Sequence, residues 1–167
     1  MVAVVRDRAA GGLDGVGEDG GQDRPLLADR LGVAGQVDDQ GPADQAAIAV
    51  ALRALAGGAD VVLTTGGTGL GPRDVTPEAT RAVLDREAPG IAEALRHASL
   101  AITPFAMLSR ATAGLAGRTL VVNLPGNPKA VREEWSVLAP VLAHAVATAR
   151  GPVPDESHRH PPNPGHA

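Results

Sequence analysis

The sequence of 167 residues contains no cysteine, no tyrosine, one tryptophan and one phenylalanine. Without cysteine there is no disulfide bond, no thiolate metal ligand and no cysteine nucleophile, so any chemistry depends on His, Asp, Glu, Lys and Arg. With so few aromatic residues, the core must be assembled from Ala, Val, Leu and Ile, which bury less area per residue. We therefore expect further apolar surface to be buried between subunits.

The Lys and Arg residues form no basic block, and the formal net charge is -4. This argues against nucleic acid as a partner, because binding it requires clustered Lys and Arg that displace counterions. A small anionic ligand is compatible, since backbone N–H groups and one or two cations can meet its charge locally. The sequence has no apolar run of about 18 residues and no basic region ahead of an apolar stretch. We expect a cytoplasmic protein with no membrane contact.

The composition divides the chain into three parts. We expect one domain over residues 1–150 and a disordered tail over residues 151–167, where Pro and His accumulate without periodicity. Residues 1–44 are rich in Gly and Asp. Patterned segments in this first part are a strand at 2–5, a helix at 25–31 and a weak strand at 33–37, with a flexible loop at 11–23.

From residue 44 onward the pattern is regular. Two short apolar runs, at 61–63 and 120–122, are typical of strands that are buried on both faces, as in a parallel sheet. Asp44 stands where it could cap a helix whose expected apolar face is Ala46, Ala47, Val50, Ala51 and Ala54. Further helices are expected at 77–86, 91–100 and 129–149, the last interrupted at Pro140. Strands alternating with helices predict an open, mostly parallel α/β sheet with helices on both faces.

A glycine-rich segment, TTGGTG at residues 64–69, directly follows the first apolar run. Glycines at such a strand end can bring backbone N–H groups close to a phosphate, although a tight turn alone would also explain them. The chain continues as GPRDVTPEAT at 71–80, where Thr76 could cap a helix beginning at Pro77. Because ligands bind outside the carboxyl ends of strands, we expect this loop to meet the second loop, NLPGNP at 123–128, at one edge of the sheet.

These segments closely resemble the signature of the MoaB/Mog family of molybdenum cofactor biosynthesis, the molybdopterin adenylyltransferases. TTGGTG at 64–69 and PRDVTPEAT at 72–80 carry the resemblance, and PGI at 89–91, LSR at 108–110 and NLPGNPK at 123–129 follow in the family's order. The resemblance implies a three-layer α/β domain that forms a homotrimer. It also implies Mg²⁺-dependent transfer of AMP from ATP to molybdopterin, with a molybdate-inserting protein as a candidate partner.

The first part of the chain departs from the family pattern. VVRDRA at residues 4–9 resembles the family's first strand and its Ser-Asp-Arg-Ala turn, but Arg6 replaces the small hydroxyl residue. A noncatalytic molybdopterin-binding scaffold protein of the same fold is therefore the alternative. A second alternative is a related hydrolase of the competence-damage-inducible type, whose glycine loop generally carries different residues.

Two aspartates are the expected catalytic residues and magnesium ligands. Transfer of a nucleotidyl group gathers charge on phosphoryl oxygens, so the site needs a cation, positioned donors and carboxylates. Asp74 matches a catalytic aspartate of the family, and Asp44 resembles a second one. Taken alone, Asp74 could form an Asx turn and Asp44 a helix cap. Asp38 and Asp39 compete with Asp44, which we favour because it starts the helix that leads into residues 61–63.

The remaining site residues come from both loops and from the LSR segment. The turn after the second apolar run could bind the pterin ring or its phosphate, with a lysine charge beside it, or it could be an ordinary Pro-Gly turn. Ser109 and Arg110 could face phosphate or solvate a turn. The residues expected to bind nucleotide or pterin are Thr65, Gly66, Gly67, Thr68, Gly69, Arg73, Thr76, Ser109, Asn123, Pro125, Gly126, Asn127 and Lys129.

Overall fold

The computed structural model describes residues 2–6, 32–37 and 45–151, and in the first two ranges it describes the backbone alone. Several expectations lie outside the described residues: the helix at 25–31, the loop at 11–23 and the tail from residue 152. The three candidate carboxylates Asp38, Asp39 and Asp44 lie outside them as well.

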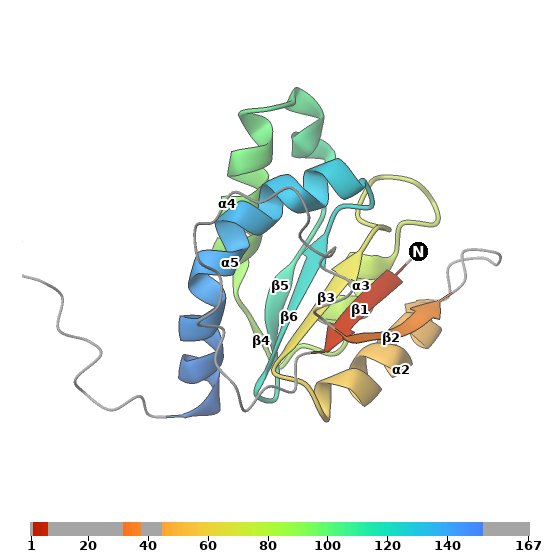
Figure 1. Cartoon of the computed structure of the whole chain (residues 1–167). Helices are drawn as coiled ribbons and strands as arrows, with labels where there is room; N and C mark the ends of the chain where they lie inside the picture. The colour runs from red at the N-terminus through yellow and green to blue at the C-terminus, as the bar shows by residue number, and fades with distance from the viewer. Residues whose placement is uncertain (1, 7–31, 38–44, 152–167) are drawn as a thin grey trace, which may run out of the picture.

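The described elements alternate along the chain and build one sheet (Figure 1). In order they are β1 (Val2–Arg6), β2 (Gly32–Val37), α2 (Gln45–Ala56), β3 (Val61–Thr65), α3 (Thr76–Arg81), β4 (Arg86–Glu87), α4 (Pro89–Leu100), the 3-10 helix η1 (Pro104–Leu108), β5 (Ala113–Ala116), β6 (Thr119–Leu124) and α5 (Pro128–Arg150). The strands lie in the order β2-β1-β3-β6-β5-β4. The expected strands near residues 2–5, 33–37, 61–63 and 120–122 are therefore all present.

The strand directions differ from the prediction. The α/β class is confirmed, but the described sheet is mixed: β3 and β6 run parallel, and the other pairs, β1–β2, β1–β3, β4–β5 and β5–β6, are antiparallel. A mostly parallel sheet was predicted, but among the described strands only β3 and β6 are parallel: β1 runs antiparallel to β3, and β5 was not recognised in the sequence. Residues 113–116 read AGLA, without the β-branched residues that mark strands. A two-residue connection then joins β5 to β6, which forces an antiparallel hairpin.

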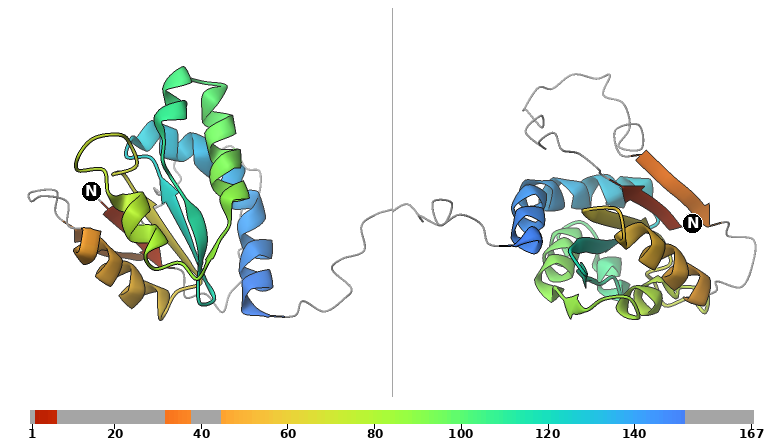
Figure 2. Two further views of the ribbon diagram at one scale, coloured as in Figure 1. Left: turned by 180° about the vertical axis from the view of Figure 1, so that it is seen from behind. Right: turned by 90° about the horizontal axis from the view of Figure 1, so that it is seen from below.

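The three-layer arrangement is confirmed by two separate cores (Figure 1, Figure 2). Val61 and Leu63 of β3 point to one face, where they pack with Leu138 and Leu142 of α5 and with α4. Val62 points to the other face and packs with Leu52 of α2 and with α3. Because side chains alternate along a strand, both runs are apolar throughout and are buried on both faces.

The helices begin where the pattern predicts, but their details differ. Helix α2 buries Ile48, Ala49 and Leu52, not the expected face, and Val50 is 64% exposed. Nearly every residue of α2 is apolar, so the sequence period does not identify the buried side. Helix α3 ends at Arg81, five residues early. Helix α5 continues through Pro140 rather than stopping, and it bends along its length (Figure 1), as an internal proline without an N–H donor causes.

Candidate functional site

The two expected loops meet at the carboxyl ends of β3 and β6. Because these strands are parallel, with Thr65 opposite Leu124, their loops leave the sheet at the same edge. Gly66 N donates to Leu124 O at 3.0 Å. A Cβ built on Gly126 would lie 3.2 Å from the Gly66 Cα, so the backbones of the two loops are in close contact. The strand pairing therefore brings residues 65–69 and 125–127 together.

The glycine loop is fitted against the start of α3. Gly66 and Gly67 have φ angles of 84° and 66°, values that favour glycine. A Cβ on Gly67 would lie 2.3 Å from Thr76 Oγ1, and Thr76 N donates to Gly67 O at 3.1 Å. Thr76 is 1% exposed and opens α3 itself, after Val75, which makes no side-chain cap. The prediction that Thr76 caps the helix was wrong, because Thr76 is the first residue of α3. Its expected contact with a ligand stays a prediction, and in this structure its hydroxyl lies under the glycine loop.

Asp74 closes a tight turn with Gly71. Asp74 N donates to Gly71 O at 3.0 Å, and Gly71 N donates to Asp74 Oδ2 at 2.9 Å. A Cβ on Gly69 or Gly71 would come within 2.9 or 2.8 Å of Oδ2, so these glycines leave room for the carboxylate. No described residue bonds to the other carboxylate oxygen, Oδ1. Residues 71–74 therefore form a β-turn that the Asp74 carboxylate closes backwards onto Gly71 N, which is not the Asx turn considered from the sequence, and Oδ1 is left available to a ligand.

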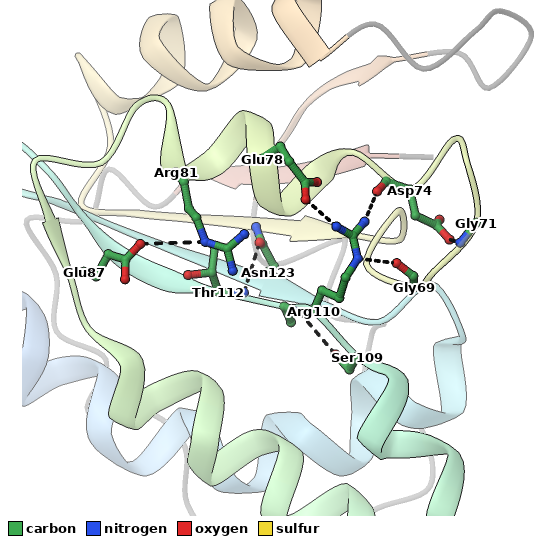
Figure 3. A network of polar contacts seen from close by, with 11 residues as sticks. Gly69, Gly71, Asp74, Glu78, Arg81, Glu87, Ser109, Arg110, Thr112 and Asn123 are labelled. Atoms are coloured by element: carbon green, nitrogen blue, oxygen red, sulfur yellow. Dashed lines mark hydrogen bonds and ion pairs between the residues drawn. The ribbon is translucent and has the colours of Figure 1, made fainter.

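Arg110 ties three segments of this site together (Figure 3). Its Nε donates to Gly69 O at 2.6 Å, Nη1 donates to the carboxylate of Glu78, and Nη2 donates to Asp74 O. Its main-chain N also donates to Thr68 O at 2.8 Å. The sequence offered Arg110 as a phosphate-facing or solvating residue, and these partners, 32 to 42 positions away, could not be read from a single sequence.

Ser109 lies in the turn before Arg110. Its Oγ accepts from Ala111 N at 3.3 Å. Arg96 of α4 donates to Ser109 O and to Ala111 O, both at 3.0 Å. In this structure the Ser109 hydroxyl stabilises the turn that contains Arg110, and the Arg96 side chain holds the two carbonyls that flank Arg110.

Both polar atoms of the Asn123 side chain form hydrogen bonds inside the protein. It is 1% exposed, its Nδ2 donates to the hydroxyls of Thr64 and Thr80 at 2.9 Å each, and its Oδ1 accepts from Thr112 N at 3.3 Å. These bonds join β3, β6 and α3 behind the loops. The expected contact of Asn123 with the pterin stays a prediction, and in this structure both polar atoms of the amide have partners inside the protein.

Two exposed cationic side chains, Arg73 and Lys129, belong to the segments that form the site. Arg73 is exposed, and no described residue pairs with its guanidinium. Asn127 caps α5 by accepting from Lys129 N at 2.9 Å. The Lys129 side chain is 73% exposed and lies 3.8 Å from Glu133. Asn127 and Lys129 directly follow the turn of Pro125 and Gly126, at the edge where the strands end.

Two hollows in the described part of the chain bear on the position of the site. One, of about 390 Å³, is lined by Leu70, Gly71, Pro72, Asp74, Val75, Glu78 and Arg110. A larger one of about 780 Å³ lies around the β5–β6 turn, at the opposite end of β3 and β6, and includes none of the expected site residues. We place the site at the smaller hollow because both loops and the free Asp74 oxygen lie at that edge.

Magnesium is compatible with this site in one mode. Among the described residues there is no cluster of three or more His, Asp or Glu side chains that could hold a metal ion. Mg²⁺ usually keeps several waters and binds through one or two carboxylates together with substrate phosphates. The free Oδ1 of Asp74 fits that mode.

Comparison with known proteins identifies the family. A family model described as a probable molybdopterin binding domain matches residues 23–144. The chain belongs to this family. The solved structure of the molybdopterin biosynthesis enzyme MoaB from Thermus thermophilus is 52% identical, with a TM-score of 0.61 over 65% of this chain and 70% of that one. The resemblance to the MoaB/Mog proteins is thus confirmed.

Two curated relatives extend the comparison. Gephyrin from Dictyostelium discoideum is 48% identical over 103 residues, which are 59% of this chain and 14% of gephyrin. A molybdopterin adenylyltransferase from Helicobacter pylori is 46% identical over 87 residues, 52% of this chain and 49% of the enzyme. The chain therefore spans half or less of the length of these relatives. No helix in the described residues is long and apolar enough to cross a membrane.

Proposed function

We propose that this protein is a molybdopterin adenylyltransferase, which transfers AMP from ATP to the terminal phosphate of molybdopterin. The observation that carries the proposal is Asp74, whose carboxylate is held between Gly69 and Gly71 with one oxygen free, beside the glycine loop. The name molybdopterin adenylyltransferase on relatives from Helicobacter pylori and Haemophilus influenzae, at 46% and 49% identity, supports it. These names favour the transferase over a noncatalytic scaffold.

The proposed reaction needs no covalent enzyme intermediate. A phosphate oxygen of molybdopterin attacks the α-phosphorus of ATP, the bond from that phosphorus to the bridging oxygen of the β-phosphate breaks, and pyrophosphate leaves with the electron pair. In this proposal, backbone N–H groups of the glycine loop and the exposed cations Arg73 and Lys129 meet the phosphate charge. Mg²⁺, held partly by Asp74, would supply neutralisation of the charge on the phosphoryl oxygens.

The test is AMP transfer by the purified protein with ATP, molybdopterin and Mg²⁺. Asp74→Asn should slow turnover by about 100-fold or more, because loss of one positioned charge-stabilising group commonly costs that much. The variant should bind molybdopterin about as tightly as the wild type, since Asn retains the oxygen that accepts from Gly71. Tight pterin binding by the wild type without AMP transfer in any divalent metal would overturn the proposal and support the scaffold alternative.

We also propose that the protein assembles as a homotrimer. Five large apolar side chains are exposed near one another in sequence at the end of α4 and along η1, where Figure 1 shows these elements projecting beyond the sheet: Leu100, Ile102, Phe105, Met107 and Leu108. An exposed apolar patch of this kind is typical of a protein interface. Light scattering over a concentration series should give three copies, and Phe105→Asp should dissociate them. A monomer at all concentrations contradicts this assignment.

The place of the reaction in the cell is also part of the proposal. The adenylylated product is a phosphate anhydride, which is an activated compound, so a molybdate-inserting partner protein is the expected consumer and the cytoplasm the expected compartment. Adding such a protein with molybdate should release AMP from the product. A product that remains unchanged in that mixture argues against the handover.

A further inference from the structure

We propose that Arg110 is the positioning residue that holds the glycine loop and the Asp74 turn in one arrangement for the proposed AMP transfer, on which this inference rests. Each nitrogen of its guanidinium has a different partner: Gly69 O, the Glu78 carboxylate and Asp74 O (Figure 3). Its main-chain N bonds to Thr68 O at 2.8 Å. One residue thus contacts the loop on both sides of the segment that carries Leu70, Gly71 and Pro72.

The loop between the two bonded carbonyls has little else to hold it. Leu70 is 66% exposed, and Gly71, Pro72 and Arg73 are exposed as well. The turn bonds between Gly71 and Asp74 order the loop internally but do not fix it to the rest of the protein. Arg110 supplies that attachment by bonding to the carbonyls at positions 69 and 74.

The partners of Arg110 require a guanidinium. Its planar fork presents donors in a fixed geometry, so it can serve three acceptors from different segments at once, whereas a lysine ammonium is a point charge on a flexible stem. Glu78 orients the fork, because its Oε1 accepts from Nη1 while its Oε2 is buried and has no partner among the described residues. The arginine charge is met by Glu78, so Arg110 acts through Asp74 and not as a free phosphate ligand.

The expected effect is on turnover rather than on substrate binding. A misplacement of about 1 Å at a reacting group can cost roughly 100-fold in rate. Arg110→Met should therefore lower kcat about 100-fold and change the KM for molybdopterin by less than about threefold. Glu78→Gln keeps an acceptor for Nη1 and should lower kcat by less than about tenfold. Arg110→Lys should recover part of the loss.

A double-variant test separates positioning from general destabilisation. If Arg110 acts through Asp74, the variant that combines Arg110→Met with Asp74→Asn should be no more than about threefold slower than Asp74→Asn alone. Arg81→Met is the matched control, because Arg81 also contacts a glutamate, Glu87, from the far end of α3 (Figure 3). It should keep kcat within about twofold of wild type. If the fold-losses in kcat of Arg110→Met and Asp74→Asn multiply in the double variant, the inference is overturned.

Hydrogen exchange gives a readout that does not depend on activity. In Arg110→Met the amides of Gly71 and Asp74 should exchange at least about tenfold faster than in the wild type, while the amides of β3 and β6 keep their protection. Arg110→Lys should fall between the two. The exchange measurement does not require AMP transfer. A failure of the proposed function can therefore be distinguished from a failure of this inference. Unchanged exchange at Gly71 and Asp74 in the folded Arg110→Met variant overturns the inference.

Discussion

Asn123 is the residue whose replacement best separates a structural role from a ligand contact. The motif suggests that it binds the pterin, whereas the structure buries it to 1% exposure between β3, β6 and α3. Asn123→Ala removes two bonds to threonine hydroxyls at 2.9 Å and the acceptor for Thr112 N at 3.3 Å. Each of those partners is itself buried, so none can turn to water.

The cost follows from the groups that are left unpaired. A buried donor or acceptor without a partner costs about 1–3 kcal/mol. The threonine hydroxyls can rotate toward other acceptors, but Thr112 N is fixed by the backbone, so we expect a loss of roughly 3–5 kcal/mol in the free energy of unfolding. Asn127→Ala is the control, because the same residue type stands four positions away as an exposed helix cap. Its loss should be about 1 kcal/mol.

Urea unfolding of the three proteins, with equal slopes, measures both losses. Molybdopterin affinity is then measured at a temperature at which both variants are folded, and Asn123→Ala should retain it within about tenfold. The reasoning is refuted by an Asn123→Ala protein that unfolds within about 0.5 kcal/mol of the wild type. If that protein also fails to bind the pterin, Asn123 is a ligand residue as the motif suggested.

Two further predictions concern stability. Gly67→Ala places a Cβ 2.3 Å from Thr76 Oγ1 at a φ of 66° and should lower the free energy of unfolding by about 2 kcal/mol, whereas Gly90→Ala, with open space around it, should be neutral or stabilising; equal urea midpoints would contradict this. Burial raises the pKa of the Glu134 carboxyl, which accepts from Ser99, so its contribution to stability is lost as pH rises through that raised value. Glu134→Gln should therefore be more stable than the wild type at pH 7 and lose that advantage below about pH 4, and an advantage that grows toward low pH would show the sign to be wrong.

A strand of the sheet could be predicted where its own residues carry the strand signal, without reference to the neighbouring strands. The apolar runs of β3 and β6 face a core on both sides, so the sequence shows them without help from neighbours. Strand β5 is visible only through its pairing with β6, since AGLA has no strand signal of its own. Helix α2 fails for the opposite reason: an excess of alanine makes every face apolar, and packing against Val62 and Val121 decides which one is buried.

The site could be predicted in position but not in the division of roles. Parallel strand ends place the two loops together, which follows from order along the chain alone. Whether a motif residue faces the ligand or the interior depends on contacts between distant segments. Arg110 and Glu78 are 32 positions apart, and Asn123 and Thr64 are 59 apart. A single sequence contains no record of these pairs, so polar residues of both kinds look alike in it.

The structure therefore gives a physical reason for the spacing of the motif. Asp74 can expose one carboxylate oxygen because the other is bonded in a turn that only glycine at positions 69 and 71 leaves open. In the inference above, Arg110 attaches that turn to the rest of the protein, and Glu78 from the helix that follows the turn accepts from Arg110. The chemistry proposed for Asp74 would thus depend on Arg110 and Glu78, whose bonds are to the protein itself. Substitutions at Gly69 or Gly71 should consequently impair AMP transfer as much as substitution of Asp74 itself, and variants at these positions with full activity would show that the turn is not needed.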